Sequence, residues 1–233
     1  MEDKSSELLH IAVCNLSTVV SHIDAMRMAA ACSYQLKHHV MPAWSGPHVA
    51  VSFVTSADHI MPGAEPVYIL DNADQAGALG YHDVDPQGRP YARIFAKTVL
   101  DNGGVTMHGP LSVSVTLSHE LCEMYGDPSA DAWALDKKSG NSYALELCDA
   151  VENDSYQVHN CSVSNFLLPA FFNLGGLSKL DYLGLCKTAF ETRPGGYQIV
   201  KDSSGNVSQV FSESYLDWKK PMKQRIKKRQ ANG

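Results

Sequence analysis

Residues 118–128 read Ser-His-Glu-Leu-Cys-Glu-Met-Tyr-Gly-Asp-Pro, and they follow Leu-Ser-Val-Ser-Val-Thr-Leu at 111–117, a run apolar enough to be buried. A Gly-Pro pair precedes this stretch and Gly-Asp-Pro ends it, so these breakers predict a helix of about four turns between them. On such a helix His119 and Glu123 are four residues apart and lie on one face. An imidazole and a carboxylate at this spacing can hold one divalent metal ion.

Glu120 is the predicted catalytic residue. It points about 100° round the helix from His119, so it can reach a metal-bound water without being a ligand. There it would act as the general base. The pattern is a variant of the His-Glu-x-x-His zinc helix in which Glu123 replaces the second histidine. The alternative is a polar helix face with both glutamates in water.

A third metal ligand is expected from a later segment. Glu146 and Asp149 lie in an otherwise apolar run, where carboxylates are costly unless they are paired or bound to metal. Glu146 is the first choice, with Asp127 and Asp149 as alternatives. Asp127 could turn back to the metal if Gly126 ended the helix, and Asp149 could instead orient His119 through a hydrogen bond. Zn²⁺ is the expected ion, and two carboxylate ligands leave Ca²⁺ and Mn²⁺ as alternatives.

The rest of the chain before this helix alternates strands with one helix. Apolar or β-branched runs predict strands at 8–13, 48–54, 65–70 and 91–96, and helical spacing predicts a helix from about 16 to 40 that Pro42 ends. This order is typical of the N-terminal half of a zincin metallopeptidase domain. The expected fold class is therefore α/β (α+β), with a mixed twisted sheet, an N-terminal helix and the metal helix.

In zincin domains the strand before the metal helix lies at the sheet edge and pairs with extended peptide substrates. Residues 91–96 would take that role here. Arg93, Ile94 and Phe95 are therefore predicted substrate-binding residues.

Three regions are expected along the chain. Residues 1–192 would form the zincin-like metal-binding domain. Residues 193–218 would add a β-hairpin that turns at 203–206. Residues 219–233 form a basic end, Lys-Lys-Pro-Met-Lys-Gln-Arg-Ile-Lys-Lys-Arg at 219–229, of the kind that is usually solvated and disordered.

Composition narrows the class of protein. The chain has 233 residues, 44% hydrophobic and 19% charged, as in an ordinary globular protein, and its net charge of −6 argues against nucleic acid as a partner except through the basic tail. It shows no signal-peptide core and no membrane-spanning run, which predicts a cytoplasmic or, for a phage protein, a virion-associated location. Six scattered cysteines predict reduced, buried thiols, and a Cys148–Cys161 disulfide stays open.

The string Ser118-His119-Glu120-x-x-Glu123, with Asp127-Pro128, Trp133, Gly140 and Glu146-x-x-Asp149 after it, resembles the plant phosphate-induced (exordium-like) proteins and uncharacterised bacterial and phage proteins. Residues 165–170, Asn-Phe-Leu-Leu-Pro-Ala, share the similarity, which covers about 118–170, roughly a quarter of the chain. The resemblance implies a zincin-like metal site but brings no established reaction with it. The plant proteins are secreted, and that location does not transfer to a chain without a signal sequence.

Two functions follow as hypotheses. The leading one is a metal-dependent hydrolase, a zinc metallopeptidase-like protein that acts on a peptide or protein. The alternative is a non-catalytic structural or binding protein, for example phage-associated, in which the metal ties the helix to residues 146–149. Nucleic-acid binding through the basic tail is a third and weaker interpretation.

Overall fold

The structure is a computed structural model that describes residues 8–75, 77–176 and 178–213. The basic tail predicted at 219–233 and the last residues of the predicted hairpin region lie outside the described residues. In the described part no helix is long and apolar enough to cross a membrane.

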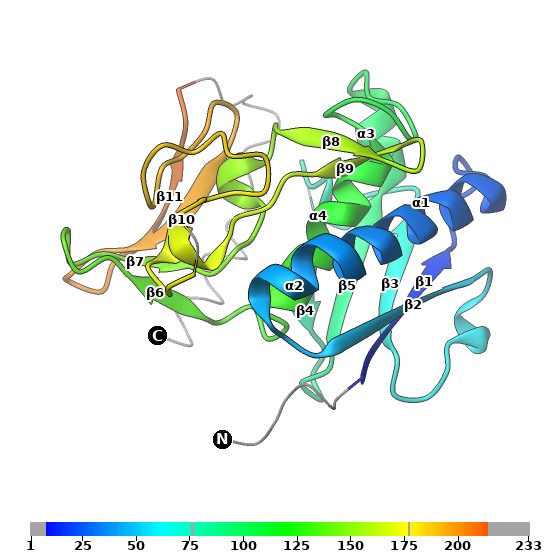
Figure 1. Cartoon of the computed structure of the whole chain (residues 1–233). Helices are drawn as coiled ribbons and strands as arrows, with labels where there is room; N and C mark the ends of the chain where they lie inside the picture. The colour runs from blue at the N-terminus through cyan, green and yellow to red at the C-terminus, as the bar shows by residue number, and fades with distance from the viewer. Residues whose placement is uncertain (1–7, 76, 177, 214–233) are drawn as a thin grey trace.

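A five-stranded mixed sheet forms one half of the molecule (Figure 1). Its strands lie in the order β2-β1-β3-β5-β4, with bounds β1 Leu8–Asn15, β2 His48–Val54, β3 Glu65–Leu70, β4 Gly80–Val84 and β5 Pro90–Phe95. β1, β2, β3 and β5 run parallel, whereas β4 is antiparallel to β5. The predicted mixed α/β architecture is confirmed at this level.

The N-terminal helix begins later and ends later than predicted. Helix α1 (His22–Gln35) is capped by the Ser21 side chain and continues through a π-helical turn, η2 (Leu36–Val40), into α2 (Met41–Trp44). Pro42 was expected to end the helix, and that prediction is wrong. Pro42 lies in the first turn of α2, where a helix needs no backbone N–H donor from it.

Helix α4 (Val113–Gly126) is the predicted metal helix, and it is the buried centre of the fold. Every residue from Val113 to Tyr125 is buried, so α4 is covered on all sides, as expected of a central helix. It packs over β5 and β4, while α1 packs over β2 and against α4. The short helix α3 (Ala96–Asp101) follows β5 and leads toward α4. The Ser112 hydroxyl caps the first turn of α4 by accepting a hydrogen bond from the Val115 N–H. The core between these layers includes Ile11, Met28, Ile69, Ile94, Leu117 and Leu121.

The chain after α4 builds two smaller sheets. One is antiparallel, in the order β11-β10-β7-β6, with bounds β6 Trp133–Leu135, β7 Ser142–Ala144, β10 Tyr197–Lys201 and β11 Val207–Phe211. The predicted hairpin is confirmed as β10–β11, and β10 also pairs with β7. The other is the hairpin of β8 (Ser155–Val158) and β9 (Cys161–Ser164), which packs on α4 and α1. Three 3₁₀ turns, η3 (Ala57–His59), η4 (Asp149–Val151) and η5 (Pro169–Phe172), complete the described chain.

The predicted edge strand is wrong. β5 lies inside the sheet between β3 and β4, and β4 occupies the edge. Because strand side chains alternate between faces, Arg93 opposite Tyr81 points to the face away from α4, where it contacts Asp74. Phe95 is buried on that same face beside Tyr81. Ile94 is fully buried in the core, so none of the three predicted substrate-binding residues is available to a substrate at the metal helix.

Candidate metal centre

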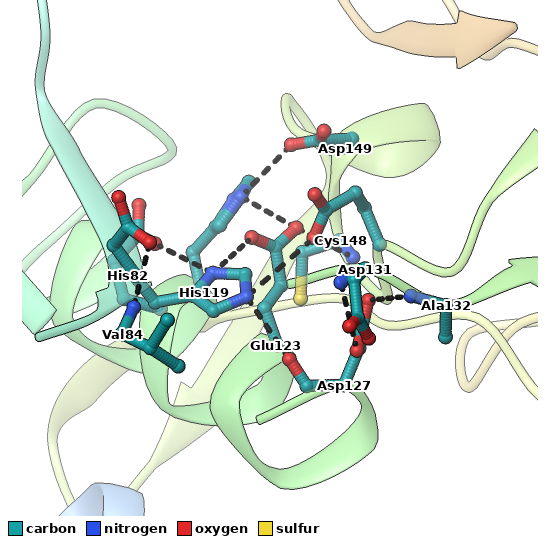
Figure 2. A network of polar contacts seen from close by, with 12 residues as sticks. His82, Val84, His119, Glu123, Asp127, Asp131, Ala132, Cys148 and Asp149 are labelled. Atoms are coloured by element: carbon teal, nitrogen blue, oxygen red, sulfur yellow. Dashed lines mark hydrogen bonds and ion pairs between the residues drawn. The ribbon is translucent and has the colours of Figure 1, made fainter. Parts of the chain in front are cut away.

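His119 and Glu123 lie on one face of α4, as their spacing predicts. The Nε2 atom of His119 lies 3.0 Å from Oε1 of Glu123. Asp149, on η4, brings its Oδ1 to 3.1 Å from the same nitrogen (Figure 2). The three residues are buried and offer ligand atoms that all lie within 4.8 Å of one another. An imidazole nitrogen and two carboxylate oxygens at these separations can hold a divalent cation.

The three candidates for the third ligand take different positions. Asp149 joins His119 and Glu123, whereas Glu146 lies beside a second histidine, His82, at 3.9 Å. The Asp127 carboxylate accepts the backbone N–H groups of Asp131 at 3.3 Å and Ala132 at 2.9 Å, so it holds the turn after α4. The geometry therefore favours Asp149, the alternative, over Glu146, the first choice.

Gly126 ends α4 without the backbone conformation expected of it. It is absent from the glycines with positive φ among the described residues. Its small size is what the fold uses, because a Cβ at this position would lie 2.2 Å from Cδ1 of Leu147. Leu147 belongs to the segment that leads to Asp149, so this close packing draws that segment against the end of α4.

His82, on the edge strand β4, is the site residue that sequence reasoning missed. Its Nδ1 atom lies 3.3 Å from Oε2 of Glu123 and 3.6 Å from Oε2 of Glu120. Its Nε2 atom lies 3.2 Å from the backbone carbonyl oxygen of Asp127, and Figure 2 shows the ring between Glu123 and Asp127. His82, Glu120 and Glu123 form a second group able to hold a metal ion. The sequence feature that could have identified His82 is the two-residue alternation of β4, which places Gly80 and His82 on the face toward α4.

Glu120 points toward β4, where it joins the group of His82 and Glu123. A Cβ added at Gly80 would lie 3.0 Å from Oε1 of Glu120 and 3.0 Å from Cγ2 of Thr116. The edge strand therefore passes directly over the Glu120 carboxylate, and any side chain larger than that of glycine at position 80 would clash with it. Glu120 itself is 3% exposed.

The electrostatics of the cluster favour a cation. Four buried carboxylates, those of Glu120, Glu123, Glu146 and Asp149, surround the two buried imidazoles. Burial alone would lower the pKa of His82, but the carboxylates of Glu120, Glu123 and Glu146 outweigh it and raise this pKa to about 10. For His119, burial is likewise outweighed by Glu123 and Asp149, which raise its pKa well above the usual value. A site that attracts protons this strongly attracts divalent cations for the same reason.

The cysteines of the described chain are all buried free thiols. The disulfide left open between Cys148 and Cys161 is therefore not formed. Cys122, on α4, is fully buried in the core, as expected, beside Cys148. Burial, followed by the neighbouring Cys122, raises the pKa of the Cys148 thiol well above the usual value. These thiols are core residues, and the candidate ligand atoms of the two groups are nitrogens and oxygens.

No protein-family model, curated protein or solved structure matches this chain. Fold and site together define a mixed α/β protein with a buried histidine and carboxylate cluster that could bind a divalent cation.

Proposed function

We propose that the protein is a metal-dependent hydrolase whose divalent cation is held by His119, Glu123 and Asp149. The observation that carries the proposal is the position of His119 Nε2, which lies 3.0 Å and 3.1 Å from one oxygen of each carboxylate. The imidazole favours Zn²⁺ or Mn²⁺ over Ca²⁺, which prefers oxygen ligands. When bound, such an ion supplies Lewis acidity and lowers the pKa of water.

Glu120 is the proposed general base. Its carboxylate is buried and belongs to the group around His82, so it is not needed to complete the set of His119, Glu123 and Asp149. A carboxylate in this position can take a proton from water and return it to a leaving amine. The low exposure of Glu120 keeps bulk water from competing for that proton.

Peptides are the proposed substrate class, and β4 takes the place that β5 was expected to fill. β4 has β5 on one side, and no other strand of the described chain pairs with its outer edge. An extended peptide can add to such an edge through main-chain hydrogen bonds. Because Gly80 and His82 of β4 lie against the carboxylates of α4, a peptide paired to β4 would run past the metal ligands.

A structural metal site is the second candidate. The observation that favours it is burial: His119, at 7%, is the most exposed of the residues in the two possible metal-binding groups. An ion held there would tie α4 to η4 and need not meet a substrate. Ligands of this kind stabilise a fold outright when they close around the metal.

The test is Glu120→Gln, compared with wild type and with Glu213→Gln, a matched change at an exposed glutamate. All three proteins are loaded with zinc, analysed for metal and screened against unfolded proteins and peptide libraries. We expect wild type and Glu213→Gln to cleave, and Glu120→Gln to lose about 10²–10⁴-fold in turnover while the ion on His119 stays bound. If metal-loaded wild type is as inert as Glu120→Gln, the hydrolase proposal gives way to the structural one.

A further inference from the structure

The Glu123 carboxylate faces two imidazoles, one with each oxygen. Oε1 lies 3.0 Å from Nε2 of His119, and Oε2 lies 3.3 Å from Nδ1 of His82. The histidines come from different elements, α4 and the edge strand β4. A carboxylate placed between two nitrogen ligands in this way matches the bridging position in a two-metal hydrolase, where the ions are about 3.5–4 Å apart.

The hydrogen bonding of His82 decides which of its nitrogens can bind an ion. The Asp127 carbonyl oxygen can only accept, so the Nε2 atom at 3.2 Å from it must carry a hydrogen. In the neutral ring Nδ1 then presents its lone pair to Glu123 and Glu120. A metal-binding histidine is commonly fixed by this kind of N–H to carbonyl bond on its other nitrogen.

The charge of the cluster supports a second cation. Glu120, Glu123, Glu146 and Asp149 contribute four negative charges when ionised. One divalent ion compensates only half of this charge, whereas two divalent ions balance all four carboxylates. Buried charge is costly unless it is compensated, and two ions compensate it fully.

We propose a second divalent cation held by Nδ1 of His82, Oε2 of Glu120 and Oε2 of Glu123, with the Glu123 carboxylate bridging the two ions. This inference rests on the proposed function, because Glu123 also serves the ion on His119. Glu120 would bind this ion through Oε2, while its Oε1 atom, which faces Gly80, would serve as the proposed base. The competing arrangement is a single ion on His119 beside a protonated His82.

The experiment counts ions on the metal-stripped full chain during titration with Mn²⁺. We expect wild type to bind about two ions, and His82→Ala and His119→Ala to bind about one each. Glu123→Gln should bind fewer than either. His59→Ala, at an exposed histidine of η3, is the matched control and should bind as wild type does.

Electron paramagnetic resonance of the Mn²⁺-saturated wild type gives a readout that needs no variant to fold. Carboxylate-bridged ions at about 3.5–4 Å should give an exchange-coupled spectrum. A wild type that binds one uncoupled ion, with the same stoichiometry in His82→Ala, overturns the second site and leaves the proposed function standing. If wild type binds no ion, both the second site and the proposed function are overturned.

Discussion

Glu65→Gln should make the protein more stable at neutral and alkaline pH. Glu65 begins β3, and its Oε2 atom is buried with no hydrogen-bond partner among the described residues. Burial raises the pKa of this carboxyl from 4.5 to about 7. Gln keeps the shape of the side chain and removes the charge.

The sign follows from where the proton is held. A carboxyl with a raised pKa in the folded state stabilises the fold in its protonated form, fully below pH 4.5, and loses that contribution as pH rises through about 7. Each unit of difference between the folded and unfolded pKa of Glu65 corresponds to about 1.4 kcal/mol, so its ionisation can destabilise the fold by at most about 3 kcal/mol. Because the side chain is partly exposed, water screens the charge and about 1–2 kcal/mol is the realistic cost of ionisation.

The assay is urea unfolding of wild type and Glu65→Gln at pH 4.5, 6 and 8. The variant should match wild type at the lowest pH and exceed it by about 1–2 kcal/mol at pH 8, equivalent to about 2–8 °C in Tm for a domain of this size. The difference between the two proteins cancels the pH response of the histidine and carboxylate cluster, which they share. A difference in free energy of unfolding between the two proteins that is constant from pH 4.5 to 8, or that shrinks as pH rises, would refute the reasoning.

Two further predictions concern packing. Gly126→Ala should destabilise the fold by about 1–3 kcal/mol in urea unfolding, because its methyl group would meet the Leu147 side chain; unchanged stability would show that Leu147 moves away freely. Thiol labelling of the native protein should modify Cys186, which is 9% exposed, before the fully buried Cys122 and Cys148. In denaturant all of these thiols should react. Rapid modification of Cys122 in the native protein, with loss of metal, would contradict its place in the core.

The sequence carries enough information for the metal helix but not for its surroundings. His119 and Glu123 share a face because helical spacing alone puts them there, and local breakers mark the ends of α4. The choice between Glu146 and Asp149 is not local. They are three residues apart in a stretch without a regular period, and the packing of Leu147 against Gly126 helps to hold that stretch in place.

The edge strand shows the same limit. β4 has five residues, Gly-Tyr-His-Asp-Val, and its polar residues and flanking turns hide the strand pattern. It forms because β5 offers an antiparallel partner, and pairing of this kind depends on tertiary context more than on propensity. Because β4 was not predicted as a strand, the sequence did not assign His82 to the face toward α4, and β5 was predicted as the edge strand.

The claim that His119, Glu123 and Asp149 hold a divalent cation is tested most directly by elemental analysis of the full chain after equilibration with zinc and removal of unbound metal. Wild type and His59→Ala should retain zinc in equal amounts, and His119→Ala should retain about one ion fewer per chain. Wild type without zinc, or His119→Ala with as much zinc as wild type, would contradict the account.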